Sequence, residues 1–196
     1  MERKTAEITT QQIKELRART GAGIVDCRNA LQQAGGDLDK AEEILKVKGL
    51  ATAQKKAGRA ATEGLIEAYI HTGGKVGAMV EVNCETDFVA RTDEFRRLSR
   101  DLAMQITASA PRYVTRDAIP AETVEEQRRL FASDLAGKPA AAVEGKLTKW
   151  YQEVVLLEQP FIRDESKTVR DLITEAISRI GENIQVRRFA RFRIGE

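Results

Sequence analysis

The chain has 196 residues, 42% of them hydrophobic and 32% charged, which suits one medium domain or two small ones. Its 32 basic and 30 acidic residues leave a formal net charge of +2, and this near-neutral balance argues against a dedicated nucleic-acid binder. The sequence has no apolar run of membrane-spanning length and no apolar segment behind the charged residues at its start, so we expect a cytoplasmic protein without a secretory signal.

The first 48 residues predict three short helices. Thr9 and Gln12 form a capping-box pattern at the start of the first helix, which Gly21 ends. Asp37 can cap the third helix, whose apolar residues recur at helical spacing. The second helix carries four apolar side chains on one side: Ile24, Cys27, Ala30 and Leu31. Because helices of this length are marginal alone, we expect the apolar faces to pack into one small core.

Residues 49–63 predict a partly helical linker. Their apolar content thins to alanine, and Gly58 interrupts a stretch that otherwise favours helix. Lys55, Lys56 and Arg59 form a basic cluster in this segment. The simplest interpretation of such a cluster is a solvated surface, because lysine and arginine are mostly exposed in folded proteins.

Two alternating runs then predict a β-hairpin. The first run covers residues 65–71, a glycine-containing turn covers 72–74, and the second run covers 76–84. The first strand places three side chains on one face: Ile66, Ala68 and Ile70. His71, the only histidine, stands at the end of this strand beside the turn, where we expect it to be exposed.

The second strand leads into VEVNCETDFVAR, residues 80–91, where the alternation of buried and exposed positions fails. A large aromatic residue, Phe88, follows the carboxylate of Asp87, and Thr92 then marks the start of a helix. In one interpretation Phe88 plugs the local core and Asp87 helps to cap that helix. In the other the short tip carries a function, because connections on a rigid scaffold often hold functional side chains.

Helical patterns fill most of the region between Thr92 and Gly181. The helix after Thr92 carries apolar residues at helical spacing: Phe95, Leu98, Leu102 and Ile106. Residues 121–158 contain two apolar stripes separated by a Gly-Lys-Pro turn, and they predict an antiparallel helical hairpin. Thr168 caps a final amphipathic helix that Gly181 ends.

The segment after Asn183 predicts a third strand with strict alternation. One face carries Ile184, Val186, Arg188, Ala190, Phe192 and Ile194, and the other carries Gln185, Arg187, Phe189, Arg191 and Arg193. The predicted fold class is α+β, with a single three-stranded antiparallel sheet covered by the helices on either side of the helical hairpin. We expect a three-helix unit over 1–48, a linker over 49–63 and an α+β core over 64–196.

Four stretches of the chain resemble the elongation factor Ts family. They are LRARTGAGIVDCRNAL near the start, KKAG at 55–58, EVNCETDFVAR and the terminal GENIQVRRFARFRIGE, so the resemblance covers nearly the whole chain. It implies that residues 1–48 adopt a three-helix fold like that of ubiquitin-associated domains and contact a partner protein. It implies that this partner is elongation factor Tu, the GTPase that carries aminoacyl-tRNA, and that the chain releases its GDP so that GTP can enter.

The resemblance also implies which residues meet the partner. The segment assigned to displacement of Mg²⁺ from elongation factor Tu consists of Thr86, Asp87, Phe88 and Val89. Further partner contacts are expected at Arg19, Gly21, Arg28, Lys55 and Lys56. Longer members of the family contain two related core subdomains, whereas this chain predicts one sheet. We therefore hypothesise a homodimer in which two sheets pack face to face.

The sequence shows no set of residues for covalent catalysis or metal binding. One histidine excludes most zinc sites, and Cys27 and Cys84 lack the spacing of metal ligands. Lys75 follows two glycines, but the spacing of a phosphate-binding loop is absent. We expect two reduced cysteines, no cofactor, no bound metal and no enzyme in the covalent sense.

The terminal strand leaves an RNA-binding module open as an alternative function. Its arginines and aromatics interleave as in a basic-aromatic platform: Arg187, Arg188, Phe189, Arg191, Phe192 and Arg193. The other interpretation is an amphipathic strand whose arginines lie along the sheet and pair with acidic residues of the helices. The near-neutral net charge favours this second interpretation, and we expect no direct contact with nucleic acid.

Overall fold

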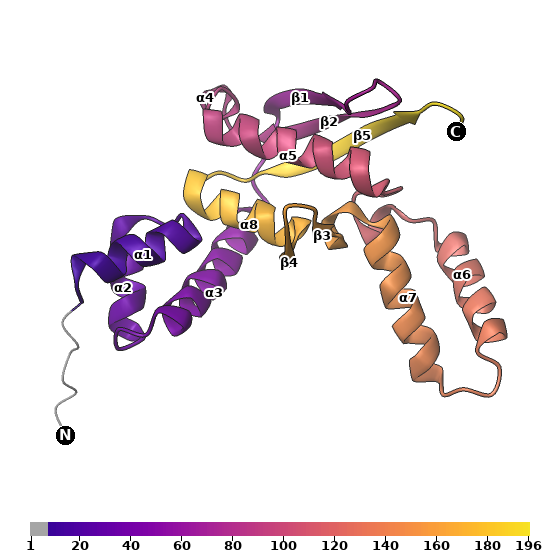
Figure 1. Cartoon of the computed structure of the whole chain (residues 1–196), viewed down its shortest axis with the longest axis horizontal. Helices are drawn as coiled ribbons and strands as arrows, with labels where there is room; N and C mark the ends of the chain where they lie inside the picture. The colour runs from indigo at the N-terminus through magenta and orange to yellow at the C-terminus, as the bar shows by residue number, and fades with distance from the viewer. Residues whose placement is uncertain (1–7) are drawn as a thin grey trace.

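The computed structural model describes residues 8–196 and has the predicted α+β architecture (Figure 1). Its helices are α1 (Thr10–Thr20), α2 (Ile24–Gln33), α3 (Leu38–Lys56), α4 (Asp87–Ala90), α5 (Asp93–Ser109), α6 (Ala121–Asp134), α7 (Ala140–Val154) and α8 (Val169–Ile180), with 3-10 turns η1 (Arg116–Ala118) and η2 (Leu156–Glu158). Its strands are β1 (Glu63–Ile70), β2 (Val76–Cys84), β3 (Pro160–Phe161), β4 (Asp164–Thr168) and β5 (Gln185–Arg193). The expectation about a secretory signal rests on residues outside the described part of the chain.

Helices α1, α2 and α3 pack into the small core that their patterns predict. The capping box of Thr9 and Gln12 is present, and Gly21 ends α1 in the left-handed conformation. The buried members of this core are Leu16, Cys27, Ala30, Leu31 and Ala41. Ile24 was wrongly assigned to the buried side of α2: its side chain is 57% exposed, because it is the first residue of the helix, one turn ahead of the first buried residue.

The third helix extends into the segment that was predicted as a partly helical linker. It continues from Leu38 through the expected linker to Lys56, so the connection to β1 shrinks to residues 57–62. The alanine-rich and lysine-rich sequence favours helix, and Gly49 is tolerated because this helix packs against α8 there. A Cβ atom on Gly49 would lie 3.7 Å from the Cβ atom of Ser178, an ordinary contact distance.

The predicted sheet forms in the order β1-β2-β5, with both pairings antiparallel. Val80, Val82 and Cys84 of β2 are buried beneath α5, which lies against β1 and β2. Helix α8 contributes Ile173 and Ile177 to the same core, but it packs chiefly against α3, α5 and the β3–β4 hairpin rather than directly on the sheet. That two-stranded hairpin is short and polar, and the sequence pattern did not predict it.

The strict alternation expected for the last strand is wrong. Opposite Glu81 and Val82 of β2 stand Arg188 and Val186, so Arg187 is an extra residue in a β-bulge. One extra residue exchanges the two faces of the strand from that point on. As a result Val186 and Phe189 both pack against the core beneath α5.

Helices α6 and α7 form the predicted antiparallel hairpin, which projects from the body of the molecule (Figure 1). Its apolar stripes meet in a separate cluster around Leu147, Trp150 and Val154, against which Val124 and Phe131 pack. Ion pairs join the two helices along their polar sides, from Arg128 to Glu144 and from Lys146 to Asp134, the latter at 3.2 Å.

Candidate functional site

The tip between β2 and α5 is a single helical turn, α4, which presents Phe88 to solvent. The ring of Phe88 is 84% exposed, whereas Val89 packs partly against the core and Ala90 is buried. The interpretation in which Phe88 plugs the local core is therefore wrong. An exposed phenylalanine on a short ordered turn is instead available to enter another molecule.

Threonine side chains fix both ends of α4. The Oγ1 atom of Thr86 accepts a hydrogen bond from the backbone N–H of Val89 at 3.4 Å and so caps α4. Thr92 Oγ1 donates to the carbonyl of Val89 at 2.8 Å and accepts from the N–H of Phe95 at 3.2 Å, so it also caps α5 as predicted. Asp87 does not cap α5, because its carboxylate pairs with Arg91 at 2.7 Å.

The strand that carries the tip ends in a polar network. Glu85 accepts a hydrogen bond from the backbone N–H of Asn183 at 2.7 Å, and this bond, helped by the charge of Arg59 at 3.5 Å, lowers the pKa of the Glu85 carboxyl. Next to it, burial raises the pKa of the Cys84 thiol to about 11, with the charge of Glu182 adding to the effect. Glu85 therefore stays ionised and Cys84 stays protonated and unreactive at neutral pH.

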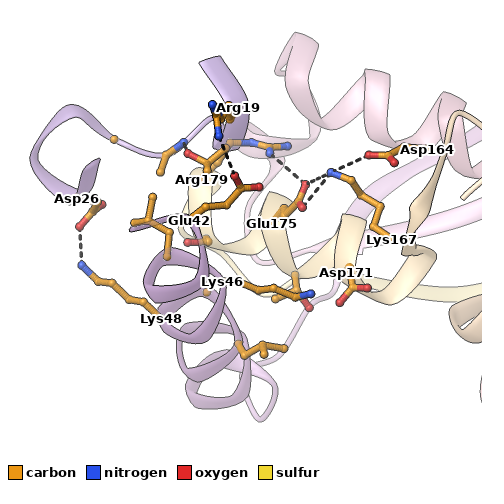
Figure 2. Close-up of a pocket in the computed structure, with 18 of the residues that line it drawn as sticks. Arg19, Asp26, Glu42, Lys46, Lys48, Asp164, Lys167, Asp171, Glu175 and Arg179 are labelled. Atoms are coloured by element: carbon orange, nitrogen blue, oxygen red, sulfur yellow. Dashed lines mark hydrogen bonds and ion pairs between the residues drawn. The ribbon is translucent and has the colours of Figure 1, made fainter. Parts of the chain in front are cut away.

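A second group of predicted contact residues lies at the end of α1, beside a cavity of about 320 Å³ that is lined by the three-helix unit, α8 and β4 (Figure 2). Arg19 pairs there with Glu15 at 2.8 Å and with Asp39 at 3.1 Å. Gly21 packs so closely on Arg179 that a Cβ atom would lie 2.8 Å from the arginine Cδ atom. Charges of both signs line this cavity, and dashed ion pairs in Figure 2 join most of them.

Comparison with known proteins shows the family to which the chain belongs. The sequence profile described as "Elongation factor TS" matches residues 4–196. The chain belongs to the elongation factor Ts family. It is 57% identical to elongation factor Ts of Carboxydothermus hydrogenoformans over 195 residues, which cover 96% of this chain and 90% of that relative. It is 54% identical to elongation factor Ts of Fervidobacterium nodosum over 196 residues, 97% of this chain and all of the relative.

Within this elongation factor Ts fold, two of the predicted site residues are linked to segments that flank the tip. Arg179, which packs on Gly21, also pairs with Glu94 in the first turn of α5 at 2.6 Å. Lys56 donates a hydrogen bond to the carbonyl of Gly181. The next residue, Glu182, accepts hydrogen bonds from the backbone N–H groups of Glu85 and Thr86, which precede α4. Arg28 and Lys55, the other two predicted contacts, are exposed and make no ion pair within residues 8–196.

Sequence reasoning missed several residues that shape this elongation factor Ts surface. Hydrogen bonds or ion pairs to the tip or to segments near it are made by Glu182, Asn183 and Arg179. The only sequence signal for these residues was their position close to Gly181, which ends α8. Ile24 and Val25 stand exposed just after the Gly21 turn. The apolar spacing that assigned Ile24 to the core hid this second exposed apolar group.

No helix among residues 8–196 has both the length and the apolar content needed to cross a bilayer. In the same part of the chain, no three His, Cys, Asp or Glu side chains gather as a possible metal site.

Proposed function

We propose that this chain is a guanine-nucleotide exchange factor that binds elongation factor Tu with GDP and releases the GDP, so that GTP can bind during translation elongation. Membership of the elongation factor Ts family supports the proposal. The observation that carries its mechanism is the exposed ring of Phe88 on the ordered turn α4. A factor with this role works in the cytoplasm and makes or breaks no covalent bond.

The proposed mechanism acts on the metal rather than on the nucleotide. GTPases hold nucleotide through backbone N–H groups at a helix N-terminus and through Mg²⁺ that bridges the phosphates. Displacing that ion removes the largest positive charge in the site. In our proposal Phe88 enters elongation factor Tu as a wedge between packed elements near the ion, while Asp87 competes for hydrogen-bond donors and Thr86 and Val89 shape the tip.

The energy available from one ring is sufficient for this task. Burying a phenylalanine side chain is worth roughly 1.5–3 kcal/mol, the size of a central anchor in an interface. Coupling between two sites is reciprocal, so a factor that weakens nucleotide binding is itself weakened by nucleotide to the same extent. Incoming GTP therefore ejects the factor, which is then free to act again.

Stopped-flow fluorescence with labelled GDP on elongation factor Tu tests the proposal. We expect the chain at saturating concentration to accelerate GDP release by at least about tenfold, since couplings of 1–3 kcal/mol correspond to roughly 5- to 150-fold changes in affinity. Co-elution of the two proteins should be lost when excess GDP is added. An unchanged release rate would contradict the proposal.

We also propose that the chain forms a homodimer through the face of the sheet opposite α5. Beyond the bulge in β5, this face has three rows across the strands β1, β2 and β5: Ile66, Glu81 and Arg188, then Ala68, Met79 and Ala190, then Ile70, Gly77 and Phe192. Ile66, Ile70, Met79 and Phe192 are exposed, and Ile194 extends the patch. Exposed contiguous apolar faces of this kind mark interaction sites. A second copy supplies an identical apolar face, and Arg188, paired with Glu81 at 2.7 Å, lies at one end of it.

Sedimentation of the Phe192→Glu variant tests the homodimer. We expect the wild-type chain to sediment as a dimer at micromolar concentration and Phe192→Glu as a monomer, because a buried unpaired carboxylate costs several kcal/mol. Leu130→Glu, which changes an exposed leucine on α6, should remain dimeric. A monomeric wild-type chain at micromolar concentration would rule the homodimer out.

The alternative of an RNA-binding module is not supported. Glu81 pairs with Arg187 at 3.7 Å and with Arg188 at 2.7 Å, and Glu196 pairs with Arg191 at 2.8 Å and with Arg193 at 3.5 Å. These partners belong to a neighbouring strand and to the last residue of the chain, not to helices as expected. The two aromatics also lie on opposite faces of the strand, as its alternation predicts, since Phe189 packs against the core while Phe192 lies on the open face.

A further inference from the structure

The carboxylate of Glu182 binds the tip from across the fold. Glu182 lies in the short connection between α8 and β5, about a hundred residues along the chain from the tip. Its Oε2 atom accepts hydrogen bonds from the backbone N–H groups of Glu85 and Thr86, both at 3.0 Å. Its Oε1 atom accepts a hydrogen bond from the hydroxyl of Thr86 at 2.6 Å. One carboxylate thus receives three hydrogen bonds from two consecutive residues.

These hydrogen bonds form just beyond the end of β2, where the backbone is no longer paired with a neighbouring strand. The last residue of β2 paired with β1 is Cys84, so Glu85 and Thr86 lie beyond the ladder. Hydrogen bonds to an ionised acceptor are about twice as strong as those between neutral groups. The hydroxyl of Thr86 also accepts from the N–H of Val89, so a single oxygen links the Glu182 carboxylate to the first turn of α4. The direction of α4 therefore depends on this carboxylate.

Glu182 is itself held in place by its neighbours. Gly181 ends α8 with φ of +86°, which turns the chain toward the tip. Asn183 is buried, and its side-chain amide donates to the carbonyl of Arg59 at 2.7 Å. Its backbone N–H donates to Glu85 Oε1 at 2.7 Å. The two segments thus stabilise each other: the Glu182 carboxylate binds the backbone of Glu85 and Thr86, and the Glu85 carboxylate binds the backbone of Asn183.

We propose that Glu182 is a positioning residue for nucleotide exchange, which fixes the direction in which α4 presents Phe88 to elongation factor Tu. The proposal rests on the exchange function proposed above. Because Phe88 is almost fully exposed, contacts of its own ring do not orient it. Its orientation therefore depends on the backbone of the turn α4. A turn held before binding loses less conformational freedom when the ring is buried in a partner.

The test compares three variants in the stopped-flow GDP-release assay with elongation factor Tu. We expect Glu182→Ala to lower the maximal release rate about tenfold, the effect of one lost charge-assisted hydrogen bond. Glu182→Gln keeps one oxygen that can accept the backbone N–H bonds, so we expect it to recover part of the rate. Glu144→Ala is the matched control, since Glu144 lies on α7 and pairs with Arg128 of α6, in the hairpin that projects away from the tip.

Two further readouts separate positioning from a general structural role. The concentration of factor that gives half the maximal rate should change less than about twofold in Glu182→Ala, because the other contact surfaces are intact. Amide hydrogen exchange should become faster at Glu85 and Thr86 and stay unchanged in the core of the sheet.

The proposal is overturned if Glu182→Ala keeps the wild-type maximal rate, if Glu144→Ala loses as much rate, or if the amides of Glu85 and Thr86 exchange as slowly as before. Failure of the exchange function looks different, since the wild-type chain itself would then leave GDP release unchanged. The hydrogen-exchange comparison tests the support of the tip by Glu182 in either case.

Discussion

Phe88→Ala is expected to slow factor-stimulated GDP release from elongation factor Tu by roughly 10- to 150-fold. The estimate follows from the roughly 1.5–3 kcal/mol gained when a phenylalanine side chain is buried, at 1.4 kcal/mol for each factor of ten. Little of that energy is used within the free chain, because the ring is 84% exposed. The measurement is stopped-flow release of labelled GDP at saturating factor, with a thermal melt to show that the fold is unchanged.

Leu130→Ala is the matched control for the loss of an exposed apolar side chain. Leu130 is exposed on α6, in the projecting hairpin at the opposite side of the molecule from α4 (Figure 1). Phe88→Leu should give an intermediate release rate, since leucine restores part of the buried area. A wild-type release rate in Phe88→Ala would remove Phe88 from the mechanism, whatever the control shows.

Most elements of the fold could be predicted because their ends carry local chemical signals. Thr9, Asp37, Thr92 and Thr168 cap the helices that their positions predict, and Gly181 ends α8. These signals act within one turn, so a single stretch of sequence contains them. The hairpin of β1 and β2 was predictable for the same reason, since its turn and its alternation are local.

The errors arose where neighbours in space decide the outcome. In the segment predicted as a partly helical linker, α3 continues to Lys56 and packs against α8 around Gly49, a contact that the local pattern does not show. The bulge at Arg187 is a feature of the pairing between β5 and β2. The alternation of residues within β5 alone carries no information about that pairing. The face of β1 with Ile66 and Ile70 was recognised as one face, but its exposure depends on α5 covering the other side.

The candidate site shows the same division. The residues of the tip were predicted from their resemblance to a family, and the failure of alternation marked where the tip begins. Phe88 could not be assigned to the core or to solvent from the pattern, because a four-residue turn is too short to show helical periodicity. Glu182, which binds this turn from the far end of the chain, could be found only once the two segments were placed side by side.

A second phenylalanine, seven residues beyond the tip, is expected to have the opposite role. Phe95 is fully buried in the core between α5 and the sheet, and Phe95→Ala should lower the free energy of unfolding by about 3–5 kcal/mol through lost contacts and the cavity left behind. Native domains are stable by only about 5–15 kcal/mol, so this loss is a large share of the total. Urea unfolding followed by circular dichroism measures it as a lower midpoint.

Comparison of the two phenylalanine variants tests the division between support and contact. Phe88→Ala should unfold at the wild-type urea midpoint while losing exchange activity. Phe95→Ala should unfold much earlier, yet its folded fraction at low temperature should still stimulate GDP release, because the ring of Phe95 is buried and reaches no partner. A Phe95→Ala variant with the wild-type midpoint would mean that burial of Phe95 does not stabilise the fold. Equal loss of stability in both variants would mean that Phe88 also serves the core of its own chain.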